Sequence, residues 1–231
     1  MLSRFFSAEG LRQMLFWIPV ILFSISFHEF SHGWVAYKLG DPTAKNAGRL
    51  TLDPIKHFNP IGFLMMLIIH FGWATPVPVD PSYFKKPRQG MLYTALAGPA
   101  SNILLALISS LLYSILAVSV KDAVFTSSFT VSLINNTGLL LLYLIYMNIG
   151  LAVFNLIPVY PLDGSRILDF FMPYKYREFM AKYGQYIQIA FMLIVILTSA
   201  VSSVISIVQT TLADVFIDMW TTVINFFVNL F

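Results

Sequence analysis

Hydrophobic residues gather in four runs that are each long enough to cross a membrane. An α-helix rises about 1.5 Å per residue, so roughly 20 apolar residues span the hydrocarbon core of a bilayer. The runs are approximately Leu11–Tyr37, Met91–Val120, Val131–Val159 and Tyr183–Val208. This pattern predicts an all-α polytopic membrane protein with about four transmembrane helices.

Two further apolar stretches fit different roles. Ile61–Trp73 is too short to span, and the prolines of the following segment Thr75–Val79 oppose a helix. Non-helical backbone at membrane depth must be covered by protein, so we expect a re-entrant or interfacial element after the first helix. Leu212–Phe231 carries Asp214 and Asp218 on one face, and it fits a C-terminal interfacial helix at least as well as a spanning one.

The composition excludes an ordinary soluble domain. Of the 231 residues, 58% are hydrophobic and 11% are charged, whereas soluble domains contain about 25% charged residues. The sequence has no internal repeat, and we expect one integral-membrane domain over residues 1–231, with a catalytic core at about 11–170 and C-terminal helices at 183–231. The first run is too long for a signal peptide, so we expect this helix to be retained.

Basic residues are distributed unevenly between the segments that join the runs. Lysine and arginine are frequent after the first run and after the third, but rare on the opposite side. By the positive-inside rule, both basic segments lie in the cytosol and the N-terminus lies outside. Topology therefore explains the net charge of +3, and no nucleic-acid partner is expected.

The first run contains His28-Glu29-Phe30-Ser31-His32, which is an HExxH motif. Residues four apart share one face of a helix, so His28 and His32 can bind one metal while Glu29 lies beside them as a base for metal-bound water. Ionisable groups inside a membrane are costly and are usually functional. The motif therefore predicts a protease active site within the membrane, about 15 Å from the cytosolic surface.

A catalytic zinc site needs a third protein ligand, and the chain has no cysteine to supply one. Asp163 is the best candidate, because it lies at the cytosolic end of the third run, on the same side as the histidines. Pro158 and Pro161 break the helix there and Gly164 permits a sharp turn, which would aim the carboxylate back into the bundle. A solvated aspartate in a loop that ends a helix explains the same residues equally well.

With Asn155 and Leu162-Asp163-Gly164 downstream of the HExxH helix, the chain resembles the site-2 protease family of intramembrane zinc metalloproteases. Further similarity is to the compact bacterial and archaeal branch of this family, which lacks a PDZ domain. It lies in the stretches Gly48–Pro54, Phe71–Val79 and Ala97–Asn102. The resemblance extends over about residues 26–164.

The resemblance implies a three-helix catalytic core that holds one Zn²⁺ per chain. His28, His32 and Asp163 would be its ligands, and Glu29 would be the general base. The resemblance also implies a membrane-associated β-hairpin in the region of Arg49–Leu52 and Thr75–Val79. Its edge could hold a substrate helix after that helix has locally unwound.

The family's GxxxN motif corresponds here to Gly98 and Asn102, which are expected to face the site. Asn102 would stabilise the oxyanion of the transition state, and Asn155 and Gly98 would contact the substrate. Packing offers an alternative for each residue. An asparagine can join helices by hydrogen bonds or satisfy freed backbone groups, and a glycine lets two helices approach closely.

His57 and His70 each lack a second ligand at helical spacing, so we expect them to be structural or interfacial. We expect Arg166, which follows the Leu-Asp-Gly turn, to anchor a helix end at the lipid headgroups.

These observations predict an intramembrane zinc metalloprotease that hydrolyses peptide bonds in or near transmembrane segments, as in regulated intramembrane proteolysis. The expected partners are a membrane-protein substrate and the lipid bilayer of a prokaryotic cell. The alternative is a metal or ion transporter, which normally draws its ligands from duplicated halves and does not need Glu29. A non-catalytic membrane scaffold would be expected to lack that glutamate.

Overall fold

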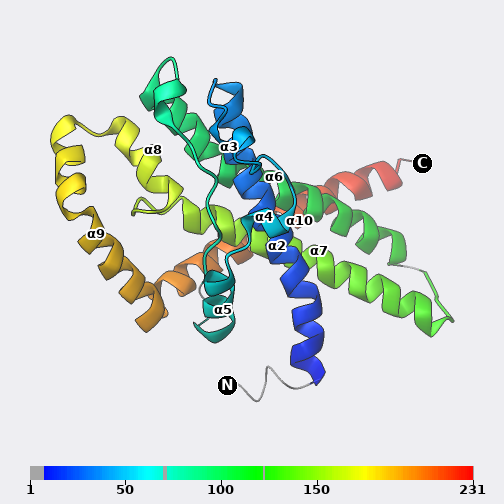
Figure 1. Ribbon diagram of the computed structural model, residues 1–231. Coiled ribbons are helices and arrows are strands. Elements are labelled where there is room, and N and C mark those ends of the chain that lie inside the picture. Colours follow the sequence, from blue (N-terminus) through cyan, green and yellow to red (C-terminus); the bar gives the residue numbers. More distant parts are fainter. Residues whose placement is uncertain (1–7, 70–71, 122, 231) are drawn as a thin grey trace.

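The computed structural model describes residues 8–69, 72–121 and 123–230, which form helices joined by turns and one extended segment (Figure 1). The helices are α2 (Ala8–Lys38), α3 (Thr43–Asn46), α4 (Pro54–His57), α5 (Pro60–Ile69), the 3-10 helix η1 (Pro81–Tyr83), α6 (Pro87–Val120), α7 (Ser128–Asn155), α8 (Asp163–Phe171), α9 (Tyr174–Leu197) and α10 (Ala200–Val228). No strand occurs within the described ranges. The predicted all-α polytopic fold is confirmed.

In the described residues, five helices are long and apolar enough to cross a membrane: α2, α6, α7, α9 and α10. Helices α2, α6 and α7 pack against one another, and α10 packs against α6 and α7. The core shared by α6, α7 and α10 contains the buried residues Ala106, Ile145, Ile149 and Ala213, and the two alanines allow close approach of the helices. Helix α9 packs mainly against α10 and stands apart from the bundle (Figure 1).

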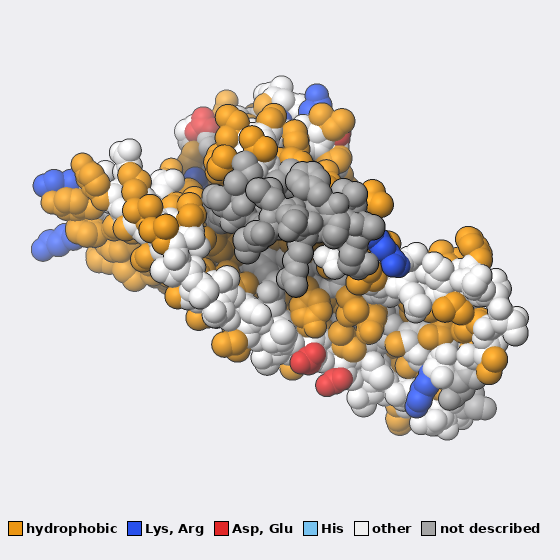
Figure 2. Space-filling model, turned by 90° about the horizontal axis from the view of Figure 1, so that it is seen from below, with side chains coloured by type: hydrophobic (Ala, Val, Ile, Leu, Met, Phe, Trp, Pro, Cys, Tyr) orange, Lys and Arg blue, Asp and Glu red, His pale blue; other side chains and the backbone are white. Residues whose placement is uncertain are grey.

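Helix α6 has its apolar side turned outward. Its exposed face carries Leu104, Ile108, Leu112 and Ile115, whereas Asn102, Ser109 and Ser110 are buried on the side that contacts the other helices. Figure 2 shows apolar side chains spread over one face of the molecule, with charged side chains few and scattered. Such a surface is suited to lipid and leaves polar groups to join the helices.

The C-terminal region differs from the predicted boundaries. The expected fourth run, Tyr183–Val208, is interrupted at Thr198, whose backbone is extended (φ −128°, ψ 155°). The Thr198 hydroxyl donates to the Ile194 carbonyl (2.7 Å) and accepts from Ala200 N (3.3 Å), which offers the backbone an alternative to helix. Residues 212–228 of the stretch Leu212–Phe231, for which an interfacial helix was expected at least as much as a spanning one, belong to the 29-residue helix α10, which is long and apolar enough to span.

The region after α2, for which a re-entrant or β-hairpin element was expected, forms short helices and an extended segment, and its described residues contain no strand; the re-entrant alternative stays a prediction. Helix α5 has ten residues, which is about 15 Å and too short to span. The extended segment that follows is fixed at Thr75, whose N–H donates to the His57 carbonyl (3.0 Å). The Arg49 guanidinium donates to the Thr75 carbonyl (2.5 Å) and to the Pro76 carbonyl (3.4 Å). The prolines at 76 and 78 explain the missing ladder, because they cannot donate hydrogen bonds.

Candidate active site

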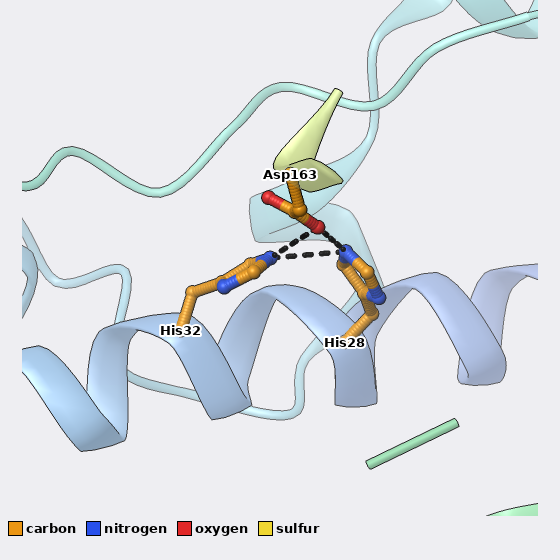
Figure 3. A group of neighbouring side chains, drawn as sticks. All are labelled: His28, His32 and Asp163. Carbon is orange, nitrogen blue, oxygen red and sulfur yellow. Dashed lines mark hydrogen bonds and ion pairs between the residues drawn. The ribbon is translucent and has the colours of Figure 1, made fainter. Parts of the chain in front are cut away.

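Three side chains from two helices converge on one point (Figure 3). His28 and His32 lie one turn apart on α2, and their Nε2 atoms are 3.0 Å from each other. Asp163 is the first residue of α8, and its Oδ2 atom lies 3.2 Å from both nitrogens. Together these residues form a group that could hold a metal ion, within the part of the chain that the structure describes. The structure thus brings together the two histidines and the aspartate that the sequence singled out.

The donor atoms of this group fit a metal cation. His32 Nδ1 lies 2.6 Å from the Thr94 carbonyl, which can only accept, so this nitrogen carries the proton and Nε2 offers a lone pair. Asp163 Oδ2 is buried and has no hydrogen-bond partner of good geometry. Ligands about 2.0 Å from a tetrahedral metal lie roughly 3.3 Å apart, close to the separations found here. Three protein ligands also leave a fourth position, as a catalytic site requires.

Asp163 reaches the histidines because the turn before α8 packs tightly on the end of α7. A Cβ atom at Gly164 would lie 2.5 Å from the Ile157 carbonyl oxygen and would overlap the Leu156 carbonyl, so only glycine fits. A carboxylate binds a metal in its anionic form, so Asp163 would bring one negative charge to two neutral imidazoles.

Glu29 lies in the same cavity as the three converging side chains. This cavity has a volume of about 200 Å³, and it is also lined by Val77, Thr94 and Asn155. Glu29 Oε2 accepts a hydrogen bond from Val77 N (2.8 Å), in the extended segment after α5. Among the described residues Oε1 has no partner, so one carboxylate oxygen is held while the other is available.

Gly98 lies beneath the two imidazole rings. A Cβ atom at this position would lie 2.6 Å from His28 Nε2 and would overlap His32 Nε2. Any side chain would therefore displace the metal-binding atoms. The close approach of α6 to α2 is sufficient to explain the glycine, and the expected contact of Gly98 with substrate stays a prediction.

Asn102 lies on the far side of His28 from the cavity. Its Oδ1 atom is 2.5 Å from His28 Nδ1, and its Nδ2 donates to Asn148 Oδ1 (2.7 Å) and to the Ser24 carbonyl (3.4 Å). The side chain is fully buried. This placement differs from that expected of an oxyanion donor, because both ends of the carboxamide are already engaged. Asn148 is not among the residues that the sequence predicted for the site, because its only signal is its polarity within an apolar run.

The remaining candidates are distributed between the cavity and its surroundings. Asn155 and Arg166 line the cavity, and Asn155 Nδ2 donates to the Leu151 carbonyl (3.0 Å). His57 is buried, with Nε2 2.8 Å from the Thr51 carbonyl, and it lies outside the metal-binding group, as expected of a structural histidine. His70 lies outside the described residues.

An HExxH pair met by a carboxylate inside a helical membrane protein is the site of a membrane-embedded metallopeptidase. Sequence comparison agrees, since residues 16–199 match the sequence model of Peptidase family M50. The chain belongs to this family.

Relatives of known name support the assignment. The chain is 38% identical over 183 residues to "Putative zinc metalloprotease YwhC" of Bacillus subtilis, which covers 78% of this chain and 80% of the relative. It is 29% identical over 155 residues to "Putative zinc metalloprotease Rip2" of Mycolicibacterium smegmatis, covering 64% of this chain and 54% of the relative. The chain thus spans about half the length of Rip2. No solved structure is significantly similar to the chain.

Proposed function

We propose that this protein is an intramembrane zinc metalloprotease that hydrolyses peptide bonds in or near transmembrane segments of membrane-protein substrates. The observation that carries the proposal is the convergence of His28 Nε2, His32 Nε2 and Asp163 Oδ2 beside Glu29, on a helix apolar enough to span. The protease would act in regulated intramembrane proteolysis. We further propose that residues 1–231 act as one integral-membrane peptidase domain.

His28, His32 and Asp163 would hold one Zn²⁺ ion. When bound, zinc supplies Lewis-acid polarisation of the scissile carbonyl and lowers the pKa of water to about 7. The remaining steps belong to the protein. Glu29 takes the proton of the attacking water on its available oxygen and later delivers it to the leaving amine. Asp163 supplies the negative charge of the ligand set, which balances part of the charge of the ion.

The backbone N–H of Val77 positions the general base. We expect Val77→Pro, which removes this donor, to lower the rate of cleavage by about 10-fold while zinc content stays unchanged, since a misplaced base forfeits part of its 10²–10⁴-fold effect. Val77→Ala is the matched control, because it keeps the N–H and removes only the side chain that packs over Gly33. Rates would be measured with both variants loaded with zinc. An equal loss in Val77→Ala would show that side-chain packing matters and that the hydrogen bond does not.

Substrate contacts would come from Asn155 and from the extended segment. Asn155 uses one amide hydrogen on the Leu151 carbonyl, which leaves the other for a substrate carbonyl in the cavity. A substrate helix must unwind before attack, because its carbonyls are engaged in intrahelical hydrogen bonds. Within the segment Thr75–Val79 only Val79 has a backbone N–H without a partner. A substrate held extended there would therefore donate mainly to backbone carbonyls.

We propose a topology in which the N-terminus lies outside and the active site opens to the cytosol, in the membrane of a prokaryotic cell. The proposal rests on the excess of lysine and arginine after α2 and after α7. The bilayer and the membrane-protein substrate are the only partners proposed for the protein.

Labelling of single cysteines would test the topology. The chain has no native cysteine, so each introduced thiol reports a single position. We expect Lys45→Cys and Lys175→Cys, both at exposed positions, to react with an impermeant thiol reagent only from the cytosolic side. Lys121→Cys, exposed at the opposite end of α6, should react only from outside. The reverse pattern would place the active site at the other membrane face.

The test of the function is a comparison of the wild-type protein with Glu29→Gln for zinc content and for cleavage of a membrane-protein substrate. A metal transporter would move zinc into vesicles without cleaving a substrate. A scaffold would do neither.

A further inference from the structure

A chain of buried polar side chains joins three helices behind His28. It runs from His28 on α2 to Asn102 on α6 and then to Asn148 on α7, with contacts of 2.5 Å and 2.7 Å. Asn148 Nδ2 in turn donates to Ser24 Oγ on α2 (2.9 Å) and to the Leu144 carbonyl (2.8 Å). Both asparagines are fully buried. A network of this kind inside a membrane is stable only when every donor and acceptor is paired.

The fixed groups of the backbone determine how both carboxamides are turned. The Leu144 carbonyl can only accept, so the nitrogen of Asn148 must face it and the oxygen of Asn148 must face Asn102. That oxygen requires a donor, so Asn102 presents its nitrogen. The Ser24 carbonyl lies on the same side of Asn102 and imposes the same choice. The oxygen of Asn102 is then left to face His28.

This orientation selects one neutral tautomer of the His28 ring, which is the form meant below. Because Asn102 presents an acceptor, His28 Nδ1 must carry the proton, and Nε2 keeps its lone pair for a metal. His32 reaches the same form directly through the Thr94 carbonyl. His28 differs, because a carboxamide turned by 180° would present a donor and would favour the wrong form.

We propose that Asn148 is a positioning residue: it holds the Asn102 carboxamide in the one orientation that makes His28 Nε2 a metal ligand. The inference rests on the proposed function only in taking that ligand to be for zinc. Asn148 contacts neither the cavity nor the ion and acts through Asn102 alone. A purely structural role, in which the asparagine joins α7 to α6, would affect stability and leave the form of the His28 ring unchanged.

The decisive variant is Asn148→Leu, compared with Asn148→Asp and with Gln209→Leu. We expect Asn148→Leu to weaken zinc binding by about 10-fold or more, as is typical when the group behind a ligating histidine is altered. A neutral aspartic acid keeps an acceptor for Asn102 and a donor for the Leu144 carbonyl, so Asn148→Asp should bind zinc almost as tightly as the wild type. Gln209→Leu is the matched control. It removes a carboxamide on α10 that donates to the Tyr146 carbonyl on α7, the helix that carries Asn148, but that has no link to His28. Affinities would be measured by competition with a chelator.

A double-mutant cycle then separates positioning from packing. If Asn148 acts through Asn102, Asn148→Leu should cause no further loss of zinc affinity in an Asn102→Leu background. Additive losses, or an equal loss in Gln209→Leu, would overturn the proposal.

A direct measurement covers the case in which a variant is unstable. In metal-free protein with ¹⁵N-labelled histidine, the wild-type His28 should be protonated at Nδ1, Asn148→Asp should preserve that form, and Asn148→Leu should populate the form protonated at Nε2 alone. Protonation of the wild-type His28 at Nε2 but not at Nδ1, or an unchanged His28 in Asn148→Leu, would overturn the inference. If the wild-type protein bound no zinc, the proposed function would fail, and this measurement would still decide the role of Asn148.

Discussion

Glu29→Gln is expected to reduce cleavage by about 100-fold or more while the protein keeps its zinc, because a general base contributes roughly 10²–10⁴-fold and is not a ligand. Glutamine has nearly the same size, and its carbonyl oxygen can still accept the hydrogen bond from Val77 N. The variant therefore removes the basic group and keeps the shape of the cavity. It separates proton transfer from metal binding more cleanly than an alanine would.

The measurement combines zinc per protein with single-turnover cleavage of a membrane-protein substrate in the same preparation. Cleavage by Glu29→Gln at a near wild-type rate would refute the mechanism. Loss of zinc together with activity would instead show that Glu29 supports the metal. Uptake of zinc into vesicles that is equal in wild type and variant, without cleavage by either, would favour the transporter.

Asp163→Ala is expected to weaken zinc binding at least as much as the 10- to 100-fold typical of changes behind the ligands, and to abolish cleavage with it. The substitution removes one metal bond and the anion that lies 3.2 Å from both imidazoles. Asp163→Asn should change zinc binding in the same direction, because a carboxamide keeps the shape but loses the charge. Zinc would be counted after purification and a mild chelator challenge.

Asp169 is the control for this experiment. It lies on the same short helix, half-buried and outside the metal-binding group of the described residues, and burial raises the pKa of its carboxyl. We expect Asp169→Ala to leave the zinc in place. If Asp163→Ala retained zinc as firmly as the wild type while Asp169→Ala did not, the third ligand would have been assigned to the wrong carboxylate.

The parts of the site that the sequence predicted well follow local rules. The spacing of His28 and His32 places them one helical turn apart, and that relation holds in any α-helix. The role of Asp163 was harder to predict, because the prolines and the glycine around it fitted a solvated loop equally well. The close packing of Gly164 on the end of α7 brings the carboxylate to the histidines, and no local pattern encodes that contact.

The parts that the sequence missed depend on contacts between helices or on a single side chain. Asn148 appears as one polar residue in an apolar run, and its partners Ser24 and Asn102 lie on two other helices. The end of α9 was misplaced because a hydropathy average extends across Thr198, whose hydroxyl competes for the helical backbone. The hydrogen bond from Val77 N to Glu29 uses the backbone and not the side chain of Val77, so no pattern of residue types in the sequence could reveal it.

The two parts of the proposed ligand set are made at different times. His28 and His32 enter the membrane with α2, but Asp163 follows only after α6 and α7 have been synthesised. A nascent chain therefore carries two ligands and a base, yet it cannot bind zinc firmly until most of its helices are in place. Proteolytic activity would thus begin only after α2, α6, α7 and the start of α8 have been made, so a shorter nascent chain would not cleave neighbouring membrane proteins.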